Sequence, residues 1–346
     1  MTGGRFFEDF RLDETLRHAT PRTLTAADAA LYVALTGSRF AVNSSAPFAR
    51  ALGYPDAPLD DLLVFNIVFG KSVPDISVNA VANLGYAECR FEAPVYSGDT
   101  LAARSTVLGL RETSNGRAGI VWVRTEGRNQ RGELVVSYVR WVMVEKRDPA
   151  APAPVAVIPR LASCVPAEAV LAPPWLDLRR YDFAAAGSAR RWGSYAPGER
   201  IDHVAGMTIE EAEHQMATRL YQNTAQVHFD RRRMAGAKSG RRLVYGGHIM
   251  SLARALSFEE LANAFRIVAI HGGRHVAPVV AGDTIYAWSE VREKFALPGR
   301  DDVAAMRLRT IAAKDHPCAD FPRKIDADAD HPAVVLELDY TVLVPR

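Results

Sequence analysis

The chain has 346 residues, which exceeds the roughly 100–200 residues of one domain, so two domains or a duplicated one are expected. Its 42 basic and 40 acidic residues leave a net charge of +2, which excludes a chain-wide positive field for nucleic acid or an anionic membrane. No apolar run reaches the roughly 18–20 residues of a membrane span, and the N-terminal segment lacks an apolar signal core. We therefore expect a folded cytoplasmic protein that binds neither nucleic acid nor membranes.

The cysteines indicate neither a disulfide framework nor a metal centre. Cys89, Cys164 and Cys318 are odd in number, far apart in the chain and without CxxC spacing. We expect them to be reduced packing residues, and we expect no metal site.

Two helix patterns and a series of strand patterns follow in the first half. Thr25 can cap a helix over 25–37 that has Asp28 in its first turn and ends at Gly37. A more apolar helix, "LDDLLVFNIVFGK", is predicted at 59–71. Strands rich in β-branched and aromatic residues are predicted at 84–91, 101–112, 119–129 and 133–144.

A segment rich in proline and alanine, residues 147–176, interrupts this pattern. Proline removes a backbone donor and breaks both helices and sheet ladders, so the segment is predicted to be a linker. An extended chain covers about 3.3 Å per residue, so it is long enough to cross a whole domain. It divides the chain into an N-terminal domain (1–146) and a C-terminal domain (177–346).

The second half repeats the first. "APVYSGDTLAARSTV" (93–107) and "APVVAGDTIYAWSEV" (277–291) share A-P-V-x-x-G-D-T and an alternating strand pattern. Their aspartates, Asp99 and Asp283, are 184 residues apart, and the matched residues His18 and His203 are 185 apart. The second half again has a helix (208–223), a long apolar helix (246–265) and a final strand (334–346). The predicted fold class is α+β, with an antiparallel sheet wrapped around a central helix, built twice.

These elements together carry a family likeness. A helix ending in "LTG", an irregular loop, a buried helix that opens on glycine and a strand entered through P-V-x-x-G-D-T resemble the MaoC-like (R)-specific enoyl-CoA hydratases. The duplication is similar to their double-hotdog subgroup. The resemblance spans both halves and implies a hotdog fold for each.

In that family the loop contains an aspartate and a histidine five residues apart, which hold the water that is added to the substrate. The loop "LYQNTAQVHF" keeps the histidine as His228 but has Asn223 at the aspartate position. In the first half, Ser38 and Asn43 stand at the two positions, and neither titrates near neutral pH. The resemblance therefore implies a degenerate first half and a catalytic second half.

His228 is the expected acid and base, because imidazole titrates close to neutral pH. Asn223 can hold water by hydrogen bonds but cannot carry a proton away. A carboxylate could still come from Asp230 or from the substrate, and His228 could instead be a buried structural histidine. The sequence leaves these alternatives open.

Gly246 and Gly247 open the long apolar helix, whose first N–H groups suit the enolate oxygen of a thioester. The alternative is a tight helix entry needed only for packing. His248 follows and is expected either to contact substrate or to cap the helix.

A basic segment follows the loop without one acidic residue, and it suits coenzyme A phosphates or an acidic acyl group. A solvated basic loop is the alternative. Arg233, Arg241 and Arg242 are the expected substrate-binding residues in it, and Arg39 or Arg219 could serve instead for an acyl carboxylate. The segment also contains Arg231, Arg232 and Lys238.

Longer phrases, such as "LYVALTGSRFAVNSSAPFAR" and "LARALSFEELANAFRIVAIH", resemble the mesaconyl-CoA hydratases within this family. This implies reversible hydration of 2-methylfumaryl-CoA (mesaconyl-C1-CoA) to (2R,3S)-β-methylmalyl-CoA, as in the ethylmalonyl-CoA pathway, without a cofactor beyond the substrate's coenzyme A. A homodimer is expected. The alternatives are a general (R)-specific enoyl-CoA hydratase, a hotdog thioesterase and a non-catalytic acyl-CoA-binding protein.

Overall fold

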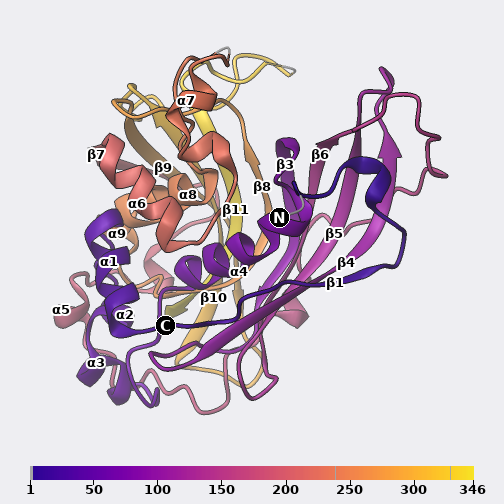
Figure 1. Cartoon of the computed structure of the whole chain (residues 1–346). Helices are drawn as coiled ribbons and strands as arrows, with labels where there is room; N and C mark the ends of the chain where they lie inside the picture. The colour runs from indigo at the N-terminus through magenta and orange to yellow at the C-terminus, as the bar shows by residue number, and fades with distance from the viewer. Residues whose placement is uncertain (1–2, 238, 328) are drawn as a thin grey trace.

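The computed structural model describes residues 3–237, 239–327 and 329–346, and an antiparallel sheet dominates this part of the chain (Figure 1). The strand order is β1-β4-β5-β6-β3-β8-β11-β10-β9-β7, with the short strand β2 paired to β4. Along the sheet, the strands of the first half therefore follow one another from one edge, and the strands of the second half continue to the other edge. The two sides meet where β3 pairs with β8.

The predicted elements of the first half are confirmed. Helix α1 (Ala26–Thr36) begins after Thr25, with Asp28 reaching back to the Thr25 N–H, and ends at Gly37, whose φ of 71° is left-handed. The apolar helix α4 (Asp61–Ile76) is almost entirely buried. The remaining elements are η1 (Phe7–Asp9), β1 (Thr15–Arg17), β2 (Arg22–Thr23), α2 (Ala41–Ser44), α3 (Ala46–Ala51), β3 (Ala80–Phe91), β4 (Thr100–Glu112), β5 (Ala118–Arg128) and β6 (Leu134–Glu145).

The second half has the same order with one difference from the prediction. The predicted helix over 246–265 is wrong in its length, since α8 spans Gly246–Leu256 and a short α9 spans Phe258–Leu261. Asn263 donates to the carbonyls of Ser188 and Arg190, so tertiary contacts turn the chain into β8 (Arg266–His275). The other elements are η2 (Ala167–Ala169), α5 (Phe183–Ala186), η3 (Trp192–Ser194), β7 (Arg200–Thr208), α6 (Glu211–Leu220), η4 (Gln226–His228), α7 (Arg231–Met234), β9 (Thr284–Ala296), β10 (Val303–Lys314) and β11 (Val334–Pro345).

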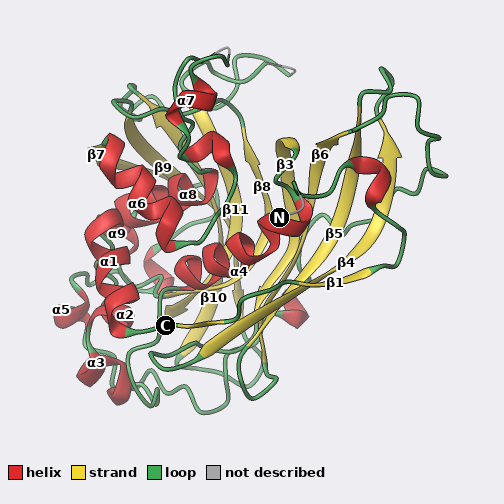
Figure 2. Cartoon of the chain, viewed as in Figure 1, coloured by secondary structure: helices red, strands yellow, loops and turns green. Residues whose placement is uncertain are grey.

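Each half is a hotdog, and the chain is a double hotdog. Helix α4 packs on β4, β5 and β6, and α8 packs on β7, β9, β10 and β11. Figure 2 shows these helices against one side of the strands. The two central helices touch each other at Gly247, where a Cβ atom would overlap with the side-chain oxygen of Asn66. The first half therefore contacts the start of the second half's central helix.

The internal repeat is also visible in buried polar contacts. In the first half, His18 Nε2 lies 2.7 Å from Ser105 Oγ, which lies 2.8 Å from Thr125 Oγ1. In the second half, His203, Ser289 and Thr310 form the same chain, with distances of 2.8 Å and 2.8 Å. The repeat predicted from sequence is thus confirmed at the level of individual side chains.

Residues 147–176 run across the sheet from the first half to the second. Val157 forms a β-bridge with Leu110 of β4, and the N–H of Val165 donates to His271 of β8 over 2.8 Å. The only regular element in this segment is η2. Among the described residues, no helix is long and apolar enough to cross a membrane.

Candidate active site

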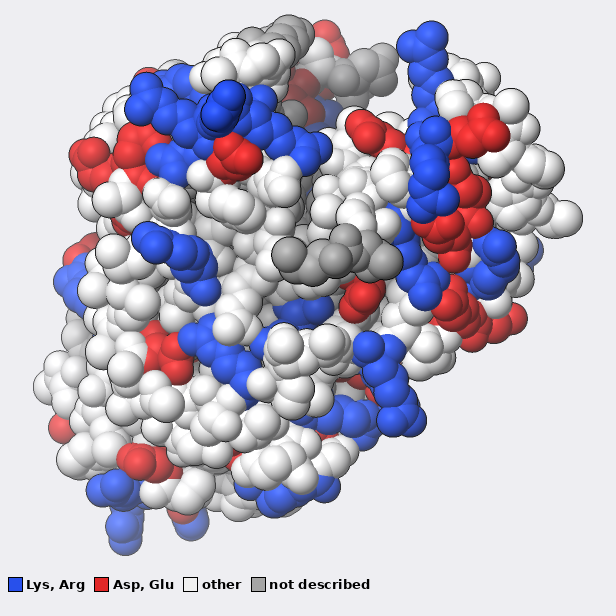
Figure 3. All heavy atoms as spheres, in the orientation of Figure 1, with Lys and Arg blue, Asp and Glu red and all other residues white. Residues whose placement is uncertain are grey.

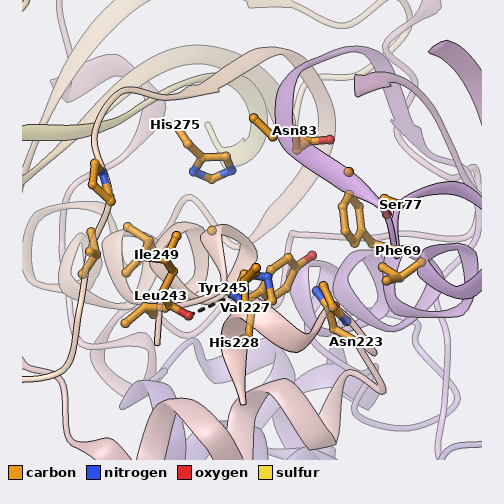
Figure 4. A pocket seen from close by; sticks show the side chains of 18 of the residues that line it. Phe69, Ser77, Asn83, Asn223, Val227, His228, Leu243, Tyr245, Ile249 and His275 are labelled. Atoms are coloured by element: carbon orange, nitrogen blue, oxygen red, sulfur yellow. Dashed lines mark hydrogen bonds between the residues drawn. The ribbon is translucent and has the colours of Figure 1, made fainter. Parts of the chain in front are cut away.

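A cavity of about 330 Å³ lies between the two halves, and both halves contribute to its wall (Figure 4). The second half supplies the loop after α6, the start of α8 and the end of β8. The first half supplies α4, the start of β3 and one residue of β6. The polar lining residues are Ser77, Asn83, Tyr86, Arg140, Asn223, His228, Tyr245 and His275.

His228 ends the short helix η4 and is half-buried in the cavity wall. Its Nδ1 lies 2.9 Å from the carbonyl oxygen of Leu243. Because a carbonyl can only accept, Nδ1 carries the proton and Nε2 is left as an acceptor. Burial lowers the pKa of His228 to about 4, although the hydrogen bond to Leu243 acts in the opposite direction. At neutral pH the side chain is therefore a neutral base.

Asn223 lies on the same loop and also lines the cavity. Its Oδ1 accepts from the N–H of Ala225 over 2.9 Å, which fixes the orientation of the amide, since an NH2 group cannot accept. Nδ2 has no hydrogen bond to a described residue and is the part of the amide that remains for a ligand. The structure thus brings together Asn223 and His228 on one side of the cavity, with His275 across from them (Figure 4).

The first half holds this loop in place. A Cβ atom at Gly70 of α4 would overlap with the backbone oxygen of Tyr221 and press on the N–H of Asn223. Lys71 of α4 donates to the side chain of Gln222, whose φ of 53° is left-handed. The position of Asn223 therefore depends on helix α4.

We expect Gly70→Ala to lower turnover by roughly 10–100-fold, because the added methyl group displaces the loop and small misplacements of reacting groups are costly. Steady-state kinetics would measure the effect. Gly193→Ala is the matched control, because a Cβ atom at Gly193 meets nothing within 4 Å. Unchanged kinetics in Gly70→Ala would contradict a role of α4 in positioning the loop.

The start of α8 has two backbone donors without a partner among the described residues. Its N-cap residue, Tyr245, provides no side-chain cap, and the N–H groups of Gly246 and Gly247 donate to no described residue. Gly246 lines the cavity, whereas Gly247 packs against Asn66. The close approach at Gly247 supports the packing explanation for this glycine, while its N–H group remains free.

The equivalent place in the first half is closed. Asp60, at the N-cap of α4, accepts from the N–H of Leu62 over 2.9 Å and so uses a donor that is free in α8. Asn43 donates to the carbonyl of Pro58, and the cavity beside it measures only about 10 Å³. An acyl group has no space there.

The remaining residues expected to bind substrate lie outside the cavity lining. His248 is fully buried, with Nε2 3.3 Å from Glu213 of α6. Arg242 pairs with Glu211, and Arg241 bonds to the carbonyl of Ala281. Arg233 bonds to Gln226.

The alternative residues also have other contacts. Arg39 is exposed and pairs with Glu259, and Arg219 is exposed on α6. Asp230 caps α7 by accepting from the N–H of Arg233 over 3.0 Å. Lys238 lies outside the described residues. Figure 3 shows basic side chains gathered over the α7 segment, where Arg231, Arg232 and Arg233 are exposed.

The structure adds six polar lining residues that the sequence did not single out, among them His275, Tyr245, Asn83 and Arg140. His275 lines the cavity, and burial lowers its pKa to about 4. The Tyr245 hydroxyl and both side-chain polar atoms of Asn83 are buried without a described hydrogen-bond partner. Arg140 is fully buried in the wall supplied by the first half. No local motif marks Asn83, Arg140 or His275, because the pairing of strands that are distant in the sequence brings them to the cavity.

Known proteins are similar to the chain over nearly all its length. A β-methylmalyl-CoA dehydratase from Chloroflexus aurantiacus is 59% identical, with 99% of this chain and 97% of the relative covered. A mesaconyl-CoA hydratase from Cereibacter sphaeroides is 57% identical, with 99% and 98% covered. A solved MaoC domain protein dehydratase from C. aurantiacus superposes with a TM-score of 0.97 at 59% identity, covering 99% and 98% of the chains.

The protein is therefore a MaoC-like hydro-lyase with a double hotdog fold. A sequence model described as mesaconyl-CoA hydratase matches residues 1–321, and the chain belongs to that family.

Proposed function

We propose that the protein hydrates 2-methylfumaryl-CoA (mesaconyl-C1-CoA) reversibly to (2R,3S)-β-methylmalyl-CoA. The names of the two relatives support the substrate pair. The observation that carries the chemistry is the neutral His228, with a proton on Nδ1 and a bare Nε2, in a cavity between the halves.

In the proposed reaction, water is held between Asn223 and His228. The Asn223 amide donates from Nδ2 to the water oxygen, and the water donates to Nε2 of His228. As the water oxygen bonds to the β-carbon, its proton passes to Nε2, and the same imidazolium then protonates the α-carbon. Since one group performs both transfers from one side, the addition is syn. Protein groups and water carry every proton, so the proposal uses no cofactor beyond coenzyme A.

The thioester oxygen becomes an enolate oxygen in this step. We place it at the start of α8, where the N–H groups of Gly246 and Gly247 are free and the helix dipole favours negative charge. The exposed arginines around α7 follow the His228 loop in the chain and suit the phosphates of coenzyme A. The expected homodimer stays a prediction that light scattering would test.

An assay with 2-methylfumaryl-CoA and crotonyl-CoA tests the proposal, with enoyl-thioester absorbance and free thiol followed in parallel. We expect rapid loss of absorbance with the first substrate, little with the second and no thiol release. Equal rates would mean a general enoyl-CoA hydratase. Thiol release would mean a thioesterase, and binding without turnover would mean an acyl-CoA-binding protein.

The pH profile follows from the pKa of His228. A histidine at its ordinary pKa near 6.5 would lose its base form as the pH falls from 7 to 6. Burial lowers the pKa of His228 to about 4, so the base form persists through that interval. We expect kcat/KM to stay level from pH 8 to about 5 and to fall only near pH 4. A midpoint near 6.5 in the free enzyme would contradict this assignment.

A further inference from the structure

Arg140 is a buried cation without an anion. It lies within β6, is 0% exposed, and its guanidinium lies over the face of Phe69 at 4.2 Å. Its hydrogen bonds go to hydroxyl groups, at 2.9 Å to Ser72 and 3.3 Å to Ser77, and its Nε has no partner among the described residues. Burial of an unpaired charge is costly, so a buried arginine normally has a carboxylate beside it.

The other two buried arginines of the described chain each have a buried carboxylate near enough to interact with electrostatically, although no direct ion pair joins them. The charge of Arg254 acts on Asp60, and the charge of Arg266 acts on Asp61. Arg140 forms no ion pair with a described carboxylate, and the ionisable groups close to it on this side are the hydroxyls of Tyr138, Tyr86 and Tyr245, which burial keeps neutral. Among these three arginines, Arg140 is therefore the one without a nearby carboxylate. It is also the only one of the three that lines the cavity between the halves.

The neighbours of Arg140 in the cavity wall are also polar and unsatisfied. Both amide atoms of Asn83, on β3, are buried without a described hydrogen-bond partner. The hydroxyl of Tyr245 is buried without one as well. Ser77 completes this group, and Figure 4 shows Ser77, Asn83 and Phe69 together on the wall supplied by the first half. An arginine fork with amide and hydroxyl donors around it is the usual composition of a carboxylate site.

The fold itself does not need an arginine at this position. Arg140 lies opposite Val123 in β5, and Tyr340 lies opposite Leu308 in β10. Val123 and Leu308 occupy equivalent positions in the repeat, as do Thr125 and Thr310. Tyr340 of the second half is therefore the equivalent of Arg140 in the first half. Tyr340 is buried and bonds to Thr310 over 3.0 Å. A neutral residue thus fills the same strand position in the half that carries His228.

We propose that Arg140 is a specificity residue that binds a free carboxylate at the far end of the acyl group, opposite the thioester. This inference rests on the proposed function, because it names the subsite that would select a dicarboxylic acyl thioester over a monocarboxylic one. Two N–H groups of the guanidinium grip the two carboxylate oxygens, with Asn83 and Ser77 as further donors. The charge that is unpaired in the free protein is then paired in the complex.

Calorimetric binding of two saturated thioesters tests the proposal without any turnover. Succinyl-CoA has a distal carboxylate, butyryl-CoA has a methyl group there, and neither can be hydrated. We expect the protein to bind succinyl-CoA at least tenfold more tightly, and Arg140→Met to lose that preference while its affinity for butyryl-CoA stays within about threefold. Arg254→Met is the matched control, because Arg254 is also buried and lies over a phenylalanine ring, at 3.8 Å from Phe40.

If Arg140→Met does not fold, Arg140→Lys keeps the charge but not the fork, and we expect the preference to fall without vanishing. Equal affinity of the wild type for the two thioesters would overturn the proposal even if 2-methylfumaryl-CoA is hydrated. An unchanged preference in Arg140→Met would overturn it as well. A lost preference in a protein that hydrates nothing would uphold the subsite and overturn the proposed function.

Discussion

Replacement of His228 by alanine is expected to lower the hydration rate about 10³-fold, within the 10²–10⁴-fold range of general acid–base catalysis. The variant loses the only base that the proposed mechanism uses, since Asn223 cannot accept a proton and Asp230 is occupied in capping α7. The absorbance of 2-methylfumaryl-CoA under saturating conditions would give kcat directly. Binding of the saturated succinyl-CoA should change little, because the carboxylate subsite is elsewhere in the cavity.

A matched control separates catalysis from packing. His271 is buried, its pKa is lowered to about 4 by burial as that of His228 is, and it lies on β8 outside the cavity lining. His271→Ala should therefore cost stability, measured as a lower Tm, with little change in kcat of the folded enzyme. Near-normal turnover in His228→Ala would end the assignment of the base.

Replacement of Asn223 by alanine is expected to lower kcat by about 10–100-fold, the effect of one lost hydrogen bond to a developing charge. The side chain has two roles that the structure separates. Oδ1 holds the loop through the Ala225 N–H, and Nδ2 faces the cavity. Stopped assays across a range of substrate concentrations would distinguish a fall in kcat from a rise in KM.

Asn223→Asp separates the two roles. An aspartate keeps an oxygen for Ala225 but replaces the cavity donor by an acceptor with negative charge, so we expect kcat at pH 8 to fall by more than tenfold. Asn43→Ala, in the corresponding loop of the first half, is the control and should leave kcat unchanged. A variant Asn223→Asp as fast as the wild type would show that a carboxylate serves equally well and would contradict the donor role.

The sequence was sufficient for most of the elements and for the loop of the candidate site that carries Asn223 and His228. Caps such as Thr25 and Gly37, and the alternation within strands, are local signals that survive in the fold. The resemblance of the loop to the family pattern singled out Asn223 and His228, the repeat aligned them with Ser38 and Asn43, and both line the cavity. The length of the helix after Gly246 was overestimated, because the turn at Asn263 is held by contacts with distant backbone.

The other polar residues of the site could not be predicted from local sequence signals. Arg140 stands in a strand pattern where outward-facing polar residues are common, and its burial depends on residues distant in the sequence, such as Phe69 and Ser72 of helix α4. His275 likewise ends a strand with no motif around it. The arginines of the basic segment were the obvious candidates in the sequence for binding an anion. Arg140 was not, because it lies within a run of mostly apolar strand residues.

The pairing of β3 with β8, which joins the two halves in one chain, also affects how a cavity shared by both halves can evolve. Two identical subunits related by a twofold axis carry every substitution twice. A new arginine in one cavity would therefore also appear in the symmetry-related cavity, together with its desolvation cost. Fusion into one chain removes that constraint. One copy can lose the catalytic residues of its loop, close its cavity and supply a cation to the other copy, while the pairing of β3 with β8 keeps the two copies together. Asymmetry of this kind is available to a covalent duplicate and is closed to a symmetric homodimer.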